Sequence, residues 1–258
     1  MAKKDDGEKV KTLERGDIYF FYRPKIEEEE PESLEEVQRL YMVLHPEGEE
    51  KYRLSIIGRK KLPDPSASGK SRYWGFVDLV RKDPKKLRDE LGRDRYHTKT
   101  RGEREVPEAR PLGEGIYRIS RHDGHTHLLY ALELPKQPGE AQQEFQLEEE
   151  ASYIISVKNP EKPTPRQAGL SEARDAEYPK KLQKKFRDRR FADADPPEFM
   201  DHEGTQFIMV AASEDIQEEL GIELQTEKES KASADVFKDL RVDKSKHPVK
   251  PLFEGEWE

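Results

Sequence analysis

Residues 115–134 read GIYRISRHDGHTHLLYALEL, and this stretch predicts an antiparallel β-hairpin. The dipeptide Asp123-Gly124 lies between two strand-like runs, and such a pair accepts the positive φ angles that a two-residue turn requires. Alternation with period two places Leu128 and Tyr130 on one face, which we expect to be the buried one. Neighbouring strands joined in this way favour a mainly antiparallel sheet over a parallel one.

The same order of elements occurs a second time along the chain. Each set consists of four strand-like runs followed by a helix, and the helices end at Gly92 and Gly221. A repeated order of the same element types indicates an internal duplication. We therefore expect an α+β fold of two similar, mainly antiparallel β-rich units, each followed by a helix. The runs are 17–24, 37–46, 52–63 and 73–80 in the first set, and 116–122, 125–134, 151–159 and 206–212 in the second.

This repeat also predicts the domain organisation. The first residues are of mixed charge and read as a mobile tail, and proline-rich or charged stretches separate the remaining parts. The predicted parts are the N-terminal tail 1–14, the first β-rich unit 15–100, the second β-rich unit 113–222 with a helical insertion at 160–200, and the C-terminal extension 223–258.

The composition is polar, with 40% charged and 33% hydrophobic residues among 258 and a net charge of -8. The apolar residues are grouped into runs of strand length, which indicates a folded core rather than disorder. The chain has no cysteine, and this excludes disulfides, thiol catalysis and cysteine-bound metal. Neither a secretory signal nor a bilayer-spanning apolar run is visible, so we expect a cytoplasmic protein without a membrane partner.

Three histidines are expected to share one face of the 115–134 hairpin. His122 and His125 flank the turn as a cross-strand pair, and His127 lies two residues further along the same strand. Three converging imidazoles could bind zinc or another divalent ion if a carboxylate or water completed the shell. The alternative is a solvated polar face, because the apolar residues of the hairpin lie on its other side. No other cofactor is expected.

A basic segment, YPKKLQKKFRDRRF over 178–191, is the second candidate site. At helical spacing Tyr178, Leu182 and Phe186 form an apolar stripe, and the predicted helix over 179–190 carries seven cations and one acid. A local net charge of +6 in an acidic protein favours an anionic partner. The alternatives are solvent and the seven glutamates of residues 27–36, within the chain or across a homodimer. The candidate anion-binding residues are Lys180, Lys181, Lys184, Lys185, Arg187 and Arg190.

These features lead to three functional hypotheses. The preferred one is a non-catalytic binding or accessory protein whose basic helix docks an anionic partner, with nucleic acid as the expected partner. The second is a metal-dependent hydrolytic enzyme that uses the hairpin histidines. The third is a structural protein in which the basic helix and the glutamate-rich loop meet across a homo-oligomer.

Overall fold

The computed structural model describes residues 10–67, 72–98, 100, 102–163, 175–224, 226, 234–243 and 246–257. Its strands are β1 (Lys11–Pro24), β2 (Val37–Pro46), β3 (Tyr52–Ile57), β4 (Arg72–Arg81), β5 (Asp94–Thr98), β6 (Gly102–Val106), β7 (Arg110–His122), β8 (His125–Leu134), β9 (Glu150–Lys158), β10 (Phe191–Asp193) and β11 (Gln206–Ser213). Its α-helices are α1 (Pro84–Leu91), α2 (Glu140–Glu144), α3 (Lys180–Gln183), α4 (Ile216–Leu220), α5 (Asp235–Lys238) and α6 (Lys250–Glu254).

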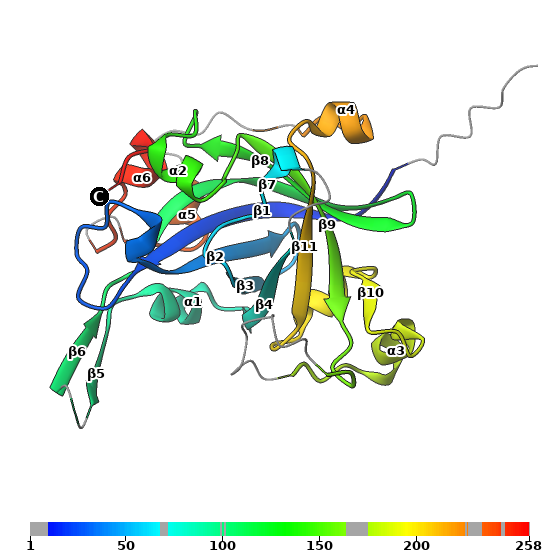
Figure 1. The fold of residues 1–258 in the computed structure, drawn as a ribbon, viewed down its shortest axis with the longest axis horizontal. Helices are drawn as coiled ribbons and strands as arrows, with labels where there is room; N and C mark the ends of the chain where they lie inside the picture. The colour runs from blue at the N-terminus through cyan, green and yellow to red at the C-terminus, as the bar shows by residue number, and fades with distance from the viewer. Residues whose placement is uncertain are drawn as a thin grey trace, which may run out of the picture.

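Eight of these strands close into an antiparallel barrel (Figure 1). Their order around it is β1, β2, β3, β4, β11, β9, β8 and β7, and β7 pairs with β1 to complete the ring. The short β10 pairs with β9 outside the ring, and β5 with β6 form a separate two-stranded arm. Closure pairs the strand edges that an open sheet of this size would expose.

The predicted α+β fold of two similar β-rich units, each followed by a helix, is wrong. The two sets of strands do not form separate sheets, because β1 pairs with β7 and β4 pairs with β11. These two seams merge all the long strands into one barrel around one interior. The described α-helices are only four to eight residues long and cover parts of the barrel, so the protein is mainly β.

The strand β1 shows why the barrel forms. Its residues 18–22 are at most 1% exposed on both faces, as the apolar sequence on both faces predicts. Ile18, Phe20 and Tyr22 point into the barrel, where Phe20 packs edge-on against Tyr130 of β8. On the other face, Tyr19 and Phe21 join a second apolar cluster outside the barrel. β1 also begins at Lys11, so residues 11–14 of the predicted tail belong to a strand; residues 1–9 lie outside the described part.

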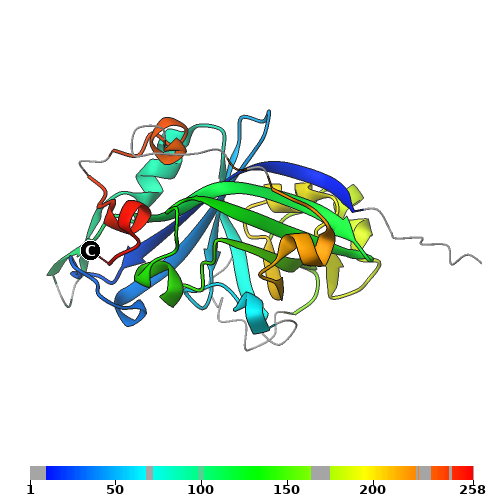
Figure 2. The same ribbon diagram turned by 90° about the horizontal axis from the view of Figure 1, so that it is seen from above.

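Three short helices supply the cover for this outer cluster. Leu87 and Leu91 of α1, Val236 of α5 and Leu252 of α6 all pack in it, and Figure 2 shows these helices gathered on one side of the barrel. α1 begins as its sequence predicts, with the Asp83 side chain accepting a hydrogen bond from the Lys85 amide and proline at the first position.

The predicted hairpin is present as β7 and β8, and its turn defines one end of the barrel, called here the hairpin end. Asp123 and Gly124 have φ angles of 47° and 76°, which confirms the predicted turn. Leu128 and Tyr130 are buried in the barrel interior, which confirms the predicted core face. The start of β1 also lies at this end, because Lys11 pairs with Arg121.

Candidate anion-binding site

The basic segment forms a shorter helix than the sequence predicts. α3 and a following 3₁₀ turn end at Phe186, and Arg187 and Asp188 both adopt positive φ angles of 47° and 62°. Leu182 and Phe186 are buried, as the apolar stripe predicts. The chain turns after Phe186 because it must enter β10, which pairs with the end of β9. Residues 187–190 are therefore presented on a turn rather than on a helix.

The cations of this segment are exposed, and none of them has an acidic partner among the residues that the structure describes. Its only acid, Asp188, pairs with Lys162 instead. The Arg189 guanidinium donates a 3.4 Å hydrogen bond to the Phe186 carbonyl oxygen, which involves no charge pairing. No described residue forms an ion pair with the six predicted anion-binding residues, which are Lys180, Lys181, Lys184, Lys185, Arg187 and Arg190.

A groove of about 610 Å³ joins part of this segment to the hairpin end of the barrel. Five cations and three aspartates line it, a net charge of +2 with His122 neutral. Of the predicted residues, Lys185 and Arg187 line the groove, while Lys180, Lys181, Lys184 and Arg190 lie outside its lining. The cations are Lys11, Arg121, Lys185, Arg187 and Arg189, and the aspartates are Asp123, Asp193 and Asp195.

One ion pair fixes the geometry of the groove. The Arg121 guanidinium donates to the Asp195 carboxylate at 2.7 Å, which ties the tip of β7 to the loop after β10. Arg121 also stands opposite Lys11 across the pairing of β1 with β7. Like charges in directly opposite positions of two antiparallel strands destabilise the pair, and the Asp195 carboxylate offsets this repulsion at Arg121.

The three hairpin histidines lie in different environments. His127 is 4% exposed and lies between Ser152 and α4: its Nδ1 is 3.2 Å from the Ser152 hydroxyl and 3.6 Å from the Glu219 carboxylate. His122 is half-buried and meets the His127 ring edge-on at 6.1 Å between ring centroids. His125 is exposed. The three histidines therefore differ in exposure: His127 is covered, His122 is half-buried and His125 is open to solvent.

Burial controls the protonation of His127 and of its neighbour Glu219. Burial lowers the pKa of His127 to about 4; protonation of His122 or His125 would act in the same direction, and the Asp123 carboxylate acts against it. Burial also raises the pKa of the Glu219 carboxyl. The His127 imidazole is thus neutral at pH 7.

The structure offers another group of metal-ligating side chains. Among the described residues, the one group of three histidine or acidic side chains whose ligand atoms all lie within 4.8 Å of one another is Asp17, His45 and Asp239. The hairpin histidines do not form such a group, and whether they bind a metal stays a prediction. Sequence reasoning missed the new group because its members are separated by 28 and 194 residues, without any spacing motif.

Sequence reasoning also missed part of the groove. Lys11 falls in the predicted mobile tail, and the one available signal for Arg121 is its place directly before His122 at the tip of the predicted hairpin. Only the pairing of β1 with β7 brings these two cations together. Arg189 was recognised as part of the basic segment but not as a site residue; the turn at 187–188 brings it into the groove.

No helix in the described part of the chain is long and apolar enough to cross a membrane. Comparison of the chain with protein families, with curated proteins and with solved structures finds no match.

Proposed function

We propose that the protein is a non-catalytic binding protein that holds nucleic acid by its phosphates in the groove at the hairpin end of the barrel. The observation that carries the proposal is the convergence of five cations from three separate segments on one groove. Of these five cations, only Arg121 forms an ion pair with an acidic residue of the groove, Asp195, within the described part of the chain. Phosphate contacts of lysine and arginine supply most of the affinity of nonspecific nucleic-acid binding.

The fold does not neutralise these cations with its own glutamate-rich loop. That loop follows Pro24, at the opposite end of β1 from Lys11. Two of its carboxylates already have partners there, since Glu27 pairs with Arg104 and Glu29 with Arg93. Figure 1 shows the arm of β5 and β6 on the opposite side of the barrel from α3 and β10. The positive charge of the groove therefore remains available to another molecule.

The size of the basic surface favours a polyanion over a single small anion. The groove alone has about 610 Å³, within the range of sites that hold a whole ligand. Beyond its lining, Lys180, Lys181 and Lys184 are exposed on the same segment and extend the positive surface. A chain of phosphates can use both parts at once, and a single phosphate cannot.

A charge-reversal experiment tests the proposal. The variant Lys185→Glu/Arg187→Glu/Arg189→Glu changes three groove cations and leaves the buried Leu182 and Phe186 in place. We expect it to bind labelled single-stranded and duplex oligonucleotides at least tenfold more weakly than the wild type, as measured by fluorescence anisotropy.

The matched control is Lys82→Glu/Lys85→Glu/Lys86→Glu. It makes the same change in net charge at exposed positions in and beside α1, away from the groove. We expect it to bind within about threefold of the wild type. Equal loss in both triple variants would show a global charge effect, and absence of wild-type binding at 150 mM salt would reject nucleic acid as the ligand. In that case, a dimer in size-exclusion chromatography with light scattering that the groove variant disrupts would favour the homo-oligomer hypothesis.

A further inference from the structure

Three segments that are distant in the sequence bring one histidine and two aspartates together outside the barrel. Asp17 belongs to β1, His45 is the penultimate residue of β2, and Asp239 follows α5 in the C-terminal part of the chain. Asp17 and His45 are direct partners in the pairing of β1 with β2. Asp239 comes to them because Val236 and Leu240 are buried in the outer apolar cluster.

The distances from the His45 imidazole to the two aspartates are longer than those of typical hydrogen bonds. His45 Nδ1 lies 3.5 Å from Asp17 Oδ2 and 3.9 Å from Asp239 Oδ2, whereas N–H···O bonds measure about 2.7–3.2 Å. The Nδ1 atom is buried, and none of the described residues meets it with normal hydrogen-bond geometry. Two ligand atoms that bind one ion at about 2.0–2.2 Å are about 3–4 Å apart, so the observed separations match those of ligands around a shared ion.

Neighbouring tyrosines hold two of the three side chains in position. The His45 ring stacks on Tyr52, with 4.3 Å between ring centroids and 23° between the planes. The Tyr19 hydroxyl donates a 3.0 Å hydrogen bond to Asp239 Oδ2, and the Tyr52 hydroxyl donates a 3.4 Å bond to the Asp239 carbonyl oxygen. Such bonds orient ligands in metal sites and are part of what makes a site bind tightly.

We propose that Asp17, His45 and Asp239 bind a divalent transition-metal ion. One imidazole with two carboxylates favours ions such as zinc or manganese, because the nitrogen ligand disfavours magnesium and calcium. Three protein ligands leave at least one coordination position for water or a further ligand.

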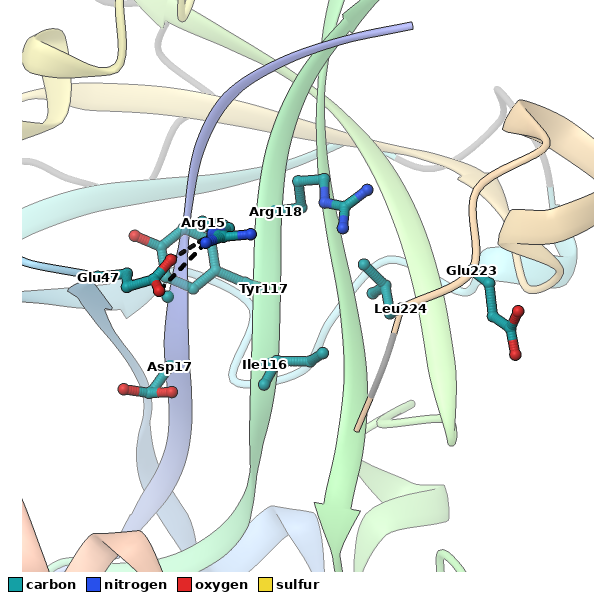
Figure 3. A pocket seen from close by; sticks show the side chains of 9 residues that line it. Arg15, Asp17, Glu47, Ile116, Tyr117, Arg118, Glu223 and Leu224 are labelled. Carbon is teal, nitrogen blue, oxygen red and sulfur yellow. Dashed lines mark hydrogen bonds and ion pairs between the residues drawn. The ribbon is translucent and has the colours of Figure 1, made fainter. Parts of the chain in front are cut away.

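The surroundings of the site give an ion access. The side chain of His45 is 21% exposed and those of both aspartates are 35% exposed, so the group is open to solvent. Asp17 also lines a neighbouring pocket of about 510 Å³ (Figure 3). Figure 3 shows the Arg15–Glu47 ion pair and Asp17 toward one side of this pocket, and Leu224 and Glu223 toward the other.

Metal binding would fasten the C-terminal part of the chain to the barrel. Residues 234–243 reach the barrel through the buried Ala234, Val236, Leu240 and Val242, and the Glu114 carboxylate accepts the amide hydrogens of Asp235 and Val236 at 3.1 and 2.8 Å. An ion shared by Asp239 and the two strand residues adds a bond between these parts. It would therefore slow the opening of this segment.

The test uses the whole chain, stripped with a chelator and titrated with zinc, manganese or magnesium chloride by isothermal calorimetry. We expect about one equivalent of zinc or manganese to bind at least tenfold more tightly than magnesium, and to raise the melting temperature. Hydrogen exchange should slow in residues 234–243 when the ion is present. Failure of both zinc and manganese to bind at up to 1 mM would overturn the proposal.

Variants separate this site from the hairpin histidines. His45→Gln, and independently Asp239→Asn, should weaken zinc binding at least tenfold and abolish the slowing of exchange. The control His125→Gln alters an exposed histidine of the hairpin and should leave zinc binding unchanged. Undiminished binding in both His45→Gln and Asp239→Asn, or its loss in His125→Gln, would assign the ion to another site. Because His45→Gln and Asp239→Asn are tested separately, one of them still tests the site if the other does not fold.

Discussion

Arg53 lies inside the barrel and donates two hydrogen bonds to the Glu14 carboxylate, at 2.5 and 2.8 Å. Its Nε donates a third to Asp201 at 2.7 Å, and the Tyr117 hydroxyl donates to Glu14 at 2.8 Å. Arg53 is fully buried, so the stabilisation of its positive charge depends on the carboxylates of Glu14 and Asp201. The network joins β1, β3, β7 and the loop before β11 at the hairpin end of the barrel.

Removing Glu14 should therefore destabilise the protein strongly. We expect Glu14→Ala to lower the free energy of unfolding by about 3–5 kcal/mol, because a buried guanidinium loses its bidentate partner. Glu47→Ala is the control, since it removes an exposed partner of Arg15 and should cost about 1 kcal/mol or less. Urea denaturation followed by circular dichroism measures both values. A similar, small loss in the two variants would contradict the importance of the buried network.

The covered His127 should make stability fall in mild acid. Its pKa is about 4 in the folded protein and about 6.5 when unfolded. Between about pH 6.5 and 4, His127 therefore binds a proton in the unfolded chain but not in the folded protein. The contribution to stability is complete above pH 6.5, is lost as the pH falls through this window, and amounts to at most about 3 kcal/mol.

The measurement is the difference between variants, because many carboxyl groups titrate in the same range. His127→Gln should have a shallower decline of unfolding free energy between pH 6.5 and 4 than the wild type. His125→Gln should follow the wild type, since His125 is exposed. Parallel curves for the wild type and His127→Gln would show that His127 is not held neutral by burial.

The C-terminal tryptophan should contribute to the core of the barrel. Trp257 is 9% exposed, and its ring centroid lies 5.4 Å from those of both Tyr22 and Phe145. We expect Trp257→Ala to cost about 3 kcal/mol, from lost burial and the cavity left behind. Trp74, the other tryptophan, is half-buried on β4, and Trp74→Ala should cost less. Thermal unfolding of the two variants makes the comparison, and a larger effect at Trp74 would contradict it.

Salt should reveal how many phosphates the groove binds. For duplex DNA, the log-log slope of affinity against salt concentration is about -0.9 per neutralised phosphate. If Lys185, Arg187 and Arg189 each neutralise one, the triple glutamate variant should have a slope that is shallower by about 2–3. An unchanged slope with weaker binding would mean that these residues shape the site without binding phosphate.

Local sequence pattern determined much of the secondary structure. The Asp123-Gly124 turn follows from residue types that accept positive φ, and the buried Leu128 and Tyr130 follow from period-two alternation. The start of α1 follows from Asp83 and Pro84. Each of these signals acts between residues that are neighbours in the chain, so periodicity and turn chemistry are sufficient to read it.

In the basic segment, local sequence pattern is not sufficient to predict where the helix ends. Its helical spacing correctly predicted the burial of Leu182 and Phe186, but it also predicted a helix through residue 190. The helix ends at Phe186 because β10 must pair with β9, where Phe191 faces Lys158. The pairing of β10 with the distant strand β9 therefore outweighs the helical preference of residues 187–190.

The sequence by itself determined the eight strands of the barrel, the hairpin turn and the strong positive charge of residues 180–190; the short β5, β6 and β10 were not predicted. Only the tertiary structure decided that these strands form one closed barrel, because closure depends on pairing Tyr22 with Arg110 and Gln206 with Phe76, residues far apart in the chain. The same closure brings Lys11 and Arg121 to the groove, and the packing of residues 234–243 brings Asp239 to His45. No local spacing encodes these approaches, since they arise from strand register and from burial of apolar surface between distant segments.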